Sequence, residues 1–230
     1  MLTLCNLFCG CIAISFCFNG SFNALITGSY FIFAAAIFDF FDGFAARLLK
    51  AHSAIGKQLD SLADMVTFGV APSFFIFQLL NFAIHKNGGS NIMVYMSFLI
   101  AVFSCLRLAK FNIDESQSTH FIGVPTPING MMLVAFPSLY MMFYNTPTFE
   151  LASSPMFLLA LTVISSLMLV APVKMIALKF TDFSIKNNLM RYILIFISLI
   201  VLMRYQVAGL TIVYLFYVGI SIINNFIEKK

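Results

Sequence analysis

The 230-residue sequence contains no tryptophan and has few charged residues. Lys, Arg, Asp and Glu make up only 10% of the chain, whereas hydrophobic residues make up 61% and the mean hydropathy is +0.97. A soluble globular domain carries about 25% charged residues, so this composition excludes that class. Without tryptophan, only the tyrosines are left to anchor the chain at the membrane interfaces. The composition indicates a polytopic membrane protein.

Other absences narrow the possibilities further. The cysteines lack the paired spacing of a zinc site, and we assign no disulfide. No basic stripe exists outside the short loops between apolar segments, so we expect no nucleic-acid binding. No Ser- or Pro-rich linker and no internal repeat divide the sequence, so we interpret residues 1–230 as one integral membrane domain.

The long apolar segments predict an all-α fold, a polytopic bundle of about eight transmembrane helices. Helices are expected because a backbone in lipid must satisfy its own hydrogen bonds. The expected helices are 2–18, 22–49, 57–84, 91–110, 127–145, 155–173, 189–204 and 207–227. The last two would form a C-terminal helical hairpin, about 189–227, with a tight turn.

The distribution of positive charge predicts the orientation. If the loop near residue 50 is cytoplasmic, every lysine and arginine except Lys86 and Arg204 faces the cytoplasm. Both termini are then cytoplasmic as well. The net charge of +4 reflects this orientation and contact with anionic membrane lipids.

Four carboxylates lie close together in the sequence, in two pairs. Asp39 and Asp42 are spaced i, i+3, and Asp60 and Asp64 are spaced i, i+4, so each pair shares a helix face. If the chain reverses near residues 51–52, all four lie at one depth, about 13 Å from the turn. Such carboxylates repel unless a cation or protons intervene, and oxygen ligands suit Mg²⁺, Mn²⁺ or Ca²⁺. The alternatives are solvated loop acids, or an ion pathway in a cation-coupled transporter.

The residues between the two acidic pairs favour phosphoryl chemistry. Gly43, Ala46 and Gly56 leave room for a phosphate or a neighbouring helix near the backbone. Arg47 could hold a phosphate through two parallel hydrogen bonds.

A second polar block lies at 104–127. Arg107 and Lys110, spaced i, i+3, share a helix face, and an ordinary juxtamembrane positive pair is the simplest alternative. Asp114 and Glu115 follow, so the block could bind both ends of a zwitterionic amino acid. Pro125 and Pro127, on either side of Thr126, would stiffen the entry into the next helix.

The first block resembles the signature of the CDP-alcohol phosphatidyltransferase family, D-x2-D-G-x2-A-R-x8-G-x3-D-x3-D. Every fixed position matches: Asp39, Asp42, Gly43, Ala46, Arg47, Gly56, Asp60 and Asp64. The resemblance implies two divalent cations, Mg²⁺ or Mn²⁺, held by the four aspartates, with Asp64 also the general base. It further implies a CDP pocket bounded by Gly43, Ala46, Arg47 and Gly56, together with Thr3 and Asn6 of the first helix. Relatives are commonly homodimers.

The second block, Arg107-x-x-Lys110-Phe-Asn112 followed by Gly-Val-Pro-Thr-Pro, resembles the phosphatidylserine synthase branch of that family. This resemblance implies that CDP-diacylglycerol and L-serine give phosphatidylserine and CMP. Arg107, Lys110 and Asn112 would bind serine. The site would face the cytoplasm of a bacterial or archaeal cell. The alternatives are a family member that uses glycerol 3-phosphate or inositol phosphate, and the transporter.

Overall fold

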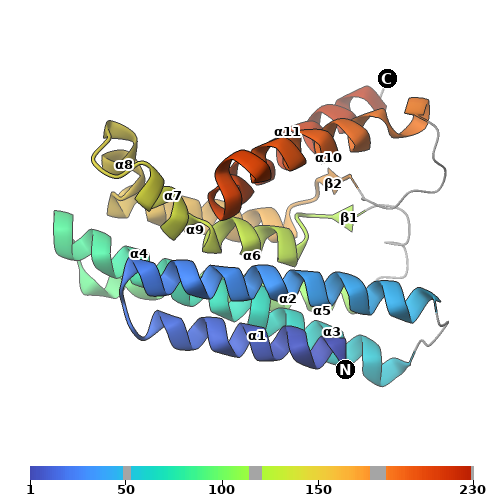
Figure 1. The fold of residues 1–230 in the computed structure, drawn as a ribbon, viewed down its shortest axis with the longest axis horizontal. Helices are drawn as coiled ribbons and strands as arrows, with labels where there is room; N and C mark the ends of the chain where they lie inside the picture. The colour runs from blue at the N-terminus through green and yellow to red at the C-terminus, as the bar shows by residue number, and fades with distance from the viewer. Residues whose placement is uncertain (49–52, 114–120, 177–184, 229–230) are drawn as a thin grey trace.

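The computed structural model describes residues 1–48, 53–113, 121–176 and 185–228 and is mostly helical (Figure 1). The N-terminal part contains α1 (Leu2–Cys17), α2 (Phe22–Leu48), α3 (Ala54–Asp64), the π-helical η1 (Met65–Val70), α4 (Ala71–Asn87), the 3₁₀-helical η2 (Asn91–Phe98) and α5 (Leu99–Ile113). After these come β1 (Phe121–Ile122), α6 (Thr126–Val134), α7 (Phe136–Met142), α8 (Pro147–Ala152), α9 (Pro155–Val170), β2 (Lys174–Met175), α10 (Ile185–Tyr205), η4 (Gln206–Ala208) and α11 (Gly209–Glu228).

Four helical stretches of the described chain are long and apolar enough to cross a membrane. They are Phe22–Ala46, Ile55–Asn87, Asn91–Ile113 and Asn188–Asn225, and the shorter helices Leu2–Cys17 and Pro155–Val170 are also apolar. The chain is therefore an integral membrane protein of helical type, as its composition predicts. The expected total of about eight spans stays a prediction.

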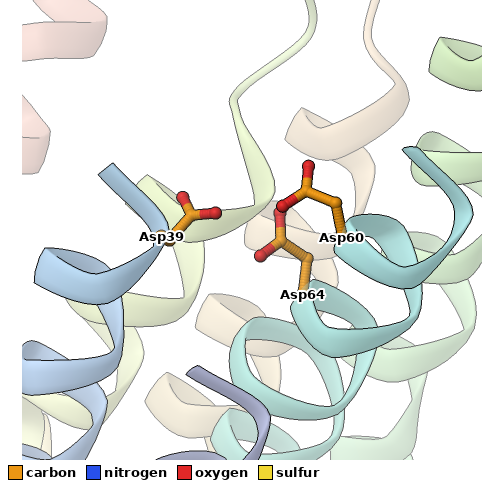
Figure 2. A group of neighbouring side chains, drawn as sticks. All are labelled: Asp39, Asp60 and Asp64. Atoms are coloured by element: carbon orange, nitrogen blue, oxygen red, sulfur yellow. The ribbon is translucent and has the colours of Figure 1, made fainter. Parts of the chain in front are cut away.

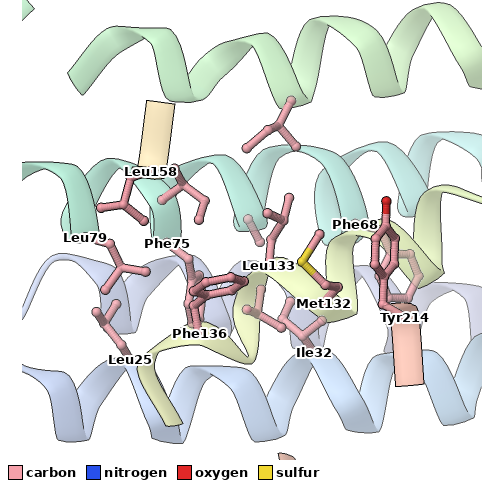
Figure 3. Packing of buried hydrophobic residues seen from close by; sticks show 14 of the residues in the cluster. Leu25, Ile32, Phe68, Phe75, Leu79, Met132, Leu133, Phe136, Leu158 and Tyr214 are labelled. Carbon is pink, nitrogen blue, oxygen red and sulfur yellow. The ribbon is translucent and has the colours of Figure 1, made fainter. Parts of the chain in front are cut away.

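A large apolar core joins the described helices of the N-terminal and C-terminal parts. It includes Phe75 and Leu79 of α4, Leu25 and Ile32 of α2, and residues of α6, α7 and α9 (Figure 3). Helix α1 packs against α2 and also against α3, η1 and α4. Because α3 continues into α4 through η1, these contacts of α1 fix α3 relative to α2.

The helix expected at 57–84 is interrupted by a π-helical segment. One run covers Ile55–Asn87, but residues 65–70 form η1, which begins directly after Asp64. Pro72 has no backbone N–H and cannot give the usual hydrogen bond to the carbonyl of Phe68, so the α-helical ladder must rearrange here. The buried residues of η1 are Thr67, Phe68 and Gly69.

Prolines also explain why two other expected helices are shorter. The predicted helix 127–145 is divided into α6 and α7, because Pro137 cannot donate to the carbonyl of Leu133. The predicted helix 155–173 ends at Val170, because Ala171 precedes Pro172 and is extended. The chain then forms β2, which pairs antiparallel with β1, so this small strand pair is an addition to the expected all-α fold.

The C-terminal helices α10 and α11 pack against each other as a hairpin (Figure 1). The turn is η4, where Gln206 has a positive φ of 49°. Asn188, near the start of α10, is non-helical and marks a kink. The hairpin contacts α6 through α11 and reaches β2 near the end of α11.

Both ends of the chain lie toward the end of the bundle where β1 and β2 pair (Figure 1). The two termini would therefore lie on the same side of the membrane. That this side is the cytoplasm stays a prediction. Several charged residues used in the orientation argument fall outside the described residues, namely Lys50, Lys179, Lys229 and Lys230; so do Asp114 and Glu115.

The close approach of α6 to η1 generates a prediction about stability. A Cβ added to Gly130 would lie 2.7 Å from the backbone oxygen of Phe68, whereas one added to Gly219 in α11 meets nothing within 4 Å. We expect Gly130→Ala to destabilise the protein by about 1–3 kcal/mol and to lower the thermal midpoint in detergent by several degrees. Gly219→Ala should leave the midpoint unchanged or raise it, and equal midpoints for the two variants would contradict this packing.

Candidate active site

Three carboxylates from two helices converge at one point. Asp39 of α2 points toward Asp60 and Asp64 of α3, and one ligand oxygen from each lies within 4.8 Å of the others (Figure 2). Asp64 is only 8% exposed, and the other two are half-buried. Three acids held this close require a cation or protons, and carboxylate oxygens are the ligands preferred by Mg²⁺ and Mn²⁺.

The local sequence positions the two acids of α3. Ser53 is the N-cap of this helix, and its hydroxyl accepts a hydrogen bond of 3.0 Å from the backbone N–H of Gly56. From this start the i, i+4 spacing brings Asp60 and Asp64 onto one face, which is turned toward α2. The helix then changes to π geometry immediately after Asp64.

Helix α1 holds the buried end of the acidic group. The side-chain amide of Asn6 donates a hydrogen bond of 3.1 Å to Asp64. Thr67 of η1 in turn donates to the backbone carbonyl of Asn6 at 3.2 Å. This contact is possible because Gly10 faces Thr67: a Cβ at position 10 would lie 2.4 Å from the Thr67 hydroxyl oxygen. Asn6 thus orients Asp64, and its own Oδ1 is buried with no hydrogen-bond partner among the described residues.

The fourth predicted ligand, Asp42, lies apart from the group of three. It accepts a hydrogen bond from the hydroxyl of Thr3 in α1. Its charge still repels those of Asp39 and Asp60, so it contributes to the same negative field. A direct role for Asp42 in metal binding stays a prediction.

Asp42 and Thr3 line a cleft of about 690 Å³ beside the acidic group. The lining residues are Met1, Thr3, Asp42, Gly43, Ala46, Ser53, Gly56, Lys57, Leu59 and Asp60. A Cβ at Gly43 would meet nothing within 4 Å, so the missing side chain leaves open space in the cleft. Three of the four residues predicted to bound the CDP pocket therefore share this cleft. The side chain of the fourth, Arg47, lies outside the described residues.

The predicted serine-binding residues divide between two environments. Arg107 is 8% exposed, donates a hydrogen bond of 3.0 Å to the Thr126 hydroxyl and interacts electrostatically with Asp64. Arg107 and Lys110 also line a cavity of about 340 Å³. Its other lining residues are Phe111, Ile113, Ile122, Leu169, Val170 and Pro172. Arg107 therefore lies between the acidic group and a cavity with two cationic residues in its wall.

Asn112 has a different setting. Its side-chain amide donates to the Ser61 hydroxyl at 2.8 Å, and its backbone carbonyl accepts from Lys57 at 2.8 Å. These two bonds tie the end of α5 to α3. The Oδ1 atom of Asn112 is buried with no partner in the described part of the chain. Serine binding by Asn112 stays a prediction.

Comparison with known proteins now decides the family. The family model described as CDP-alcohol phosphatidyltransferase matches residues 1–168. The chain belongs to this family. It is accordingly a transferase, and the three converging carboxylates lie within the matched segment.

The transferase is similar to several proteins named CDP-diacylglycerol–serine O-phosphatidyltransferase. It is 40% identical to the Bacillus subtilis protein over 141 residues, which are 61% of this chain and 75% of that protein. It is 35% identical to a Helicobacter pylori protein over 136 residues, 58% of this chain and 54% of the relative. It is 32% identical to the Methanocaldococcus jannaschii protein over 135 residues, which are 59% of this chain and 57% of that protein. The aligned part thus spans little more than half of the last two relatives.

Some residues of the transferase site have no obvious signal in the sequence. Thr126 was expected only as part of a stiff turn, and its contact with Arg107 joins residues 19 positions apart. Ser53 and Lys57 line the cleft although neither matches a fixed signature position. The Ser-x-x-Gly spacing before α3 could have identified Ser53 as the helix cap.

The geometry of the acidic group predicts a divalent-cation site that can be measured without turnover. We expect Asp60→Asn to weaken Mn²⁺ binding by more than about tenfold, because it removes one of three converging carboxylates. Binding would be measured by electron paramagnetic resonance of free Mn²⁺ with purified transferase. Glu150→Gln is the matched control, since Glu150 pairs with Lys86 at 2.9 Å and lies in α8, at the other end of the bundle. Equal affinities for the two variants would overturn the site.

Proposed function

We propose that the transferase is a phosphatidylserine synthase, which transfers the phosphatidyl group of CDP-diacylglycerol to the hydroxyl of L-serine and releases CMP. The observation that carries the proposal is the placement of buried Arg107 between Asp64 and a cavity that Lys110 also lines. An acceptor with both a hydroxyl and a carboxylate fits such a site. The relatives named for serine transfer support the same acceptor.

The donor would occupy the cleft beside the acidic group. Gly43, Ala46 and Gly56 leave space for the cytidine and pyrophosphate, and the hydroxyl of Thr3 and the ammonium of Lys57 can donate hydrogen bonds there. Arg47 is assigned to a phosphate by the signature. The acyl chains would stay in the membrane, since α2 is itself an apolar, membrane-length helix.

Asp39, Asp60 and Asp64, with Asp42 as the fourth proposed ligand, would hold two divalent cations, Mg²⁺ or Mn²⁺. When bound, these ions supply positive charge for the pyrophosphate oxygens and for the departing CMP. The unpartnered Oδ1 of Asn6 and the three converging carboxylate oxygens make the donor set suitable for a hard cation and its water.

The chemical step needs a base, and we assign this role to Asp64. The serine oxygen forms a bond to the phosphorus that carries the diacylglycerol, the bond from this phosphorus to the CMP oxygen breaks, and the serine proton passes to the Asp64 carboxylate. Asn6 fixes the carboxylate orientation through its 3.1 Å hydrogen bond. Arg107 would bind the serine carboxylate on the side of the guanidinium that faces the cavity.

The same proposal sets the membrane arrangement. The acidic group and the strand pair would face the cytoplasm, where serine and CMP are soluble, and Lys86 would face the opposite side. A bacterial or archaeal cell membrane and a homodimer are expected from the resemblance alone.

The acceptor is tested by measuring CMP release from CDP-diacylglycerol by purified protein with Mg²⁺ or Mn²⁺. We expect release with L-serine and not with glycerol 3-phosphate, inositol or inositol phosphate, because only serine offers both a hydroxyl and a carboxylate to Arg107. Release with another acceptor alone would keep the donor site and overturn the serine assignment. No release with any acceptor would favour the transporter alternative.

Asp64→Asn tests the proposed base. We expect CMP release to fall by more than about 100-fold, because the amide cannot accept the serine proton. The variant should keep its thermal midpoint, since Asn preserves the shape that Asn6 contacts, and should still bind CDP-diacylglycerol. Its Mn²⁺ affinity distinguishes loss of the base from loss of a metal ligand. Glu150→Gln is again the control for removal of a carboxylate elsewhere. Retained turnover would remove Asp64 from the role of base.

A further inference from the structure

The buried guanidinium of Arg107 is held in place by Thr126. Its Nη1 donates to the Thr126 hydroxyl at 3.0 Å, and its Nε is buried with no partner among the described residues. A buried cation is costly unless it is paired and hydrogen-bonded, so each partner of Arg107 fixes its position strongly. Its anionic neighbour in the described structure is Asp64.

Thr126 is itself fixed from the C-terminal part of the chain. It is fully buried at the first turn of α6, directly after a segment fastened to the end of α9. The backbone N–H of Gly123 donates to the carbonyl of Val173 at 2.9 Å. The backbone N–H of Val124 donates to the carbonyl of Met168 at 3.0 Å. The β1–β2 pair continues the same attachment, with Phe121 opposite Met175.

Gly123 makes this attachment sterically possible. Its φ is +77°, and a Cβ at this position would lie 2.3 Å from the carbonyl oxygen of Leu169. Leu169 also lines the cavity beside Arg107, together with Val170 and Pro172. The segment that carries Thr126 and the wall of the cavity are therefore one connected unit.

We infer that Thr126 is a positioning residue for the acceptor: its hydroxyl fixes the Arg107 guanidinium between Asp64 and the α9–β2 wall of the cavity. With Arg107 fixed, the carboxylate of the acceptor binds at a set distance from Asp64. The hydroxyl of the acceptor then lies beside the proposed base. The identity of the acceptor as serine rests on the proposed function, whereas the fixing of Arg107 by Thr126 does not.

The first test compares kinetic constants of substituted proteins. Thr126→Val keeps the side-chain shape but removes the oxygen that accepts from Arg107. We expect the KM for serine to rise roughly tenfold or more, because a buried hydrogen bond to a charged group is lost, and the KM for CDP-diacylglycerol to change by less than about twofold. Thr126→Ser should restore most of the serine affinity, and Arg107→Ala sets the full size of the effect.

Thr162→Val is the matched control. Thr162 is also fully buried, but its hydroxyl donates within α9 to the carbonyl of Leu158 at 2.7 Å. The same chemical change there should leave both KM values within about twofold of the original, as expected away from the site. Thr126→Ala is measured in parallel, so that a folding defect specific to valine can be recognised from the thermal midpoint.

A second readout does not depend on turnover. Phenylglyoxal modifies accessible arginines, and the extent at Arg107 is measured by peptide mass spectrometry. We expect modification of Arg107 to be several times faster in the Thr126→Val and Thr126→Ala variants, because the released guanidinium can move into the cavity. In Thr162→Val, the rate of Arg107 modification should equal the rate in the unsubstituted protein.

The outcomes separate the two proposals. A raised serine KM together with faster modification supports the positioning role. An unchanged modification rate in both Thr126 variants overturns it, whatever the acceptor. If serine supports no CMP release in the unsubstituted protein, the proposed function fails, and the modification rates still decide the role of Thr126.

Discussion

The mutual repulsion of Asp39, Asp60 and Asp64 is the constraint on which the rest of the structure depends. Three carboxylate oxygens within 4.8 Å of one another are unfavourable in an apolar bundle, and the fold must hold them there. The apolar core, in which α1 packs against α2 and against α3 and α4, provides this restraint (Figure 3). The stability of the core therefore maintains a charge arrangement that would otherwise separate, and that arrangement is what a divalent cation needs.

Close helix contact around the acids depends on small residues at particular points. Gly10 lets α1 approach η1 so that Asn6 reaches Asp64, and Gly130 lets α6 approach the backbone of Phe68. In a membrane, where lipid is as apolar as the side chains, such close approach and polar contacts contribute much of the helix association. The same contacts that stabilise the bundle therefore also orient the proposed base.

The acids of the candidate site could be found from the sequence because the relevant information is local. Spacing along two helices brings each pair onto one face and matches their depth, but it could not show that the two faces point toward each other. Asp42 illustrates the limit: three residues along a helix rotate a side chain by about 60° from Asp39, which turns Asp42 toward Thr3 of α1. Helix boundaries differed where proline acts, at Pro72, Pro137 and Pro172, and the rules for proline could have found each of them.

The role of Thr126 could not be predicted in this way, because it depends on contacts between distant segments. Pairing of Phe121 with Met175, and the contact of Gly123 with Leu169, join residues separated by more than 40 positions. The family match ends at residue 168, just before this attachment. The C-terminal part therefore supplies a wall for the Arg107 cavity from outside the matched segment. In the proposed function, acceptor binding would then depend on Arg107 and Thr126 inside the matched segment and on a wall from Leu169 to Pro172 outside it.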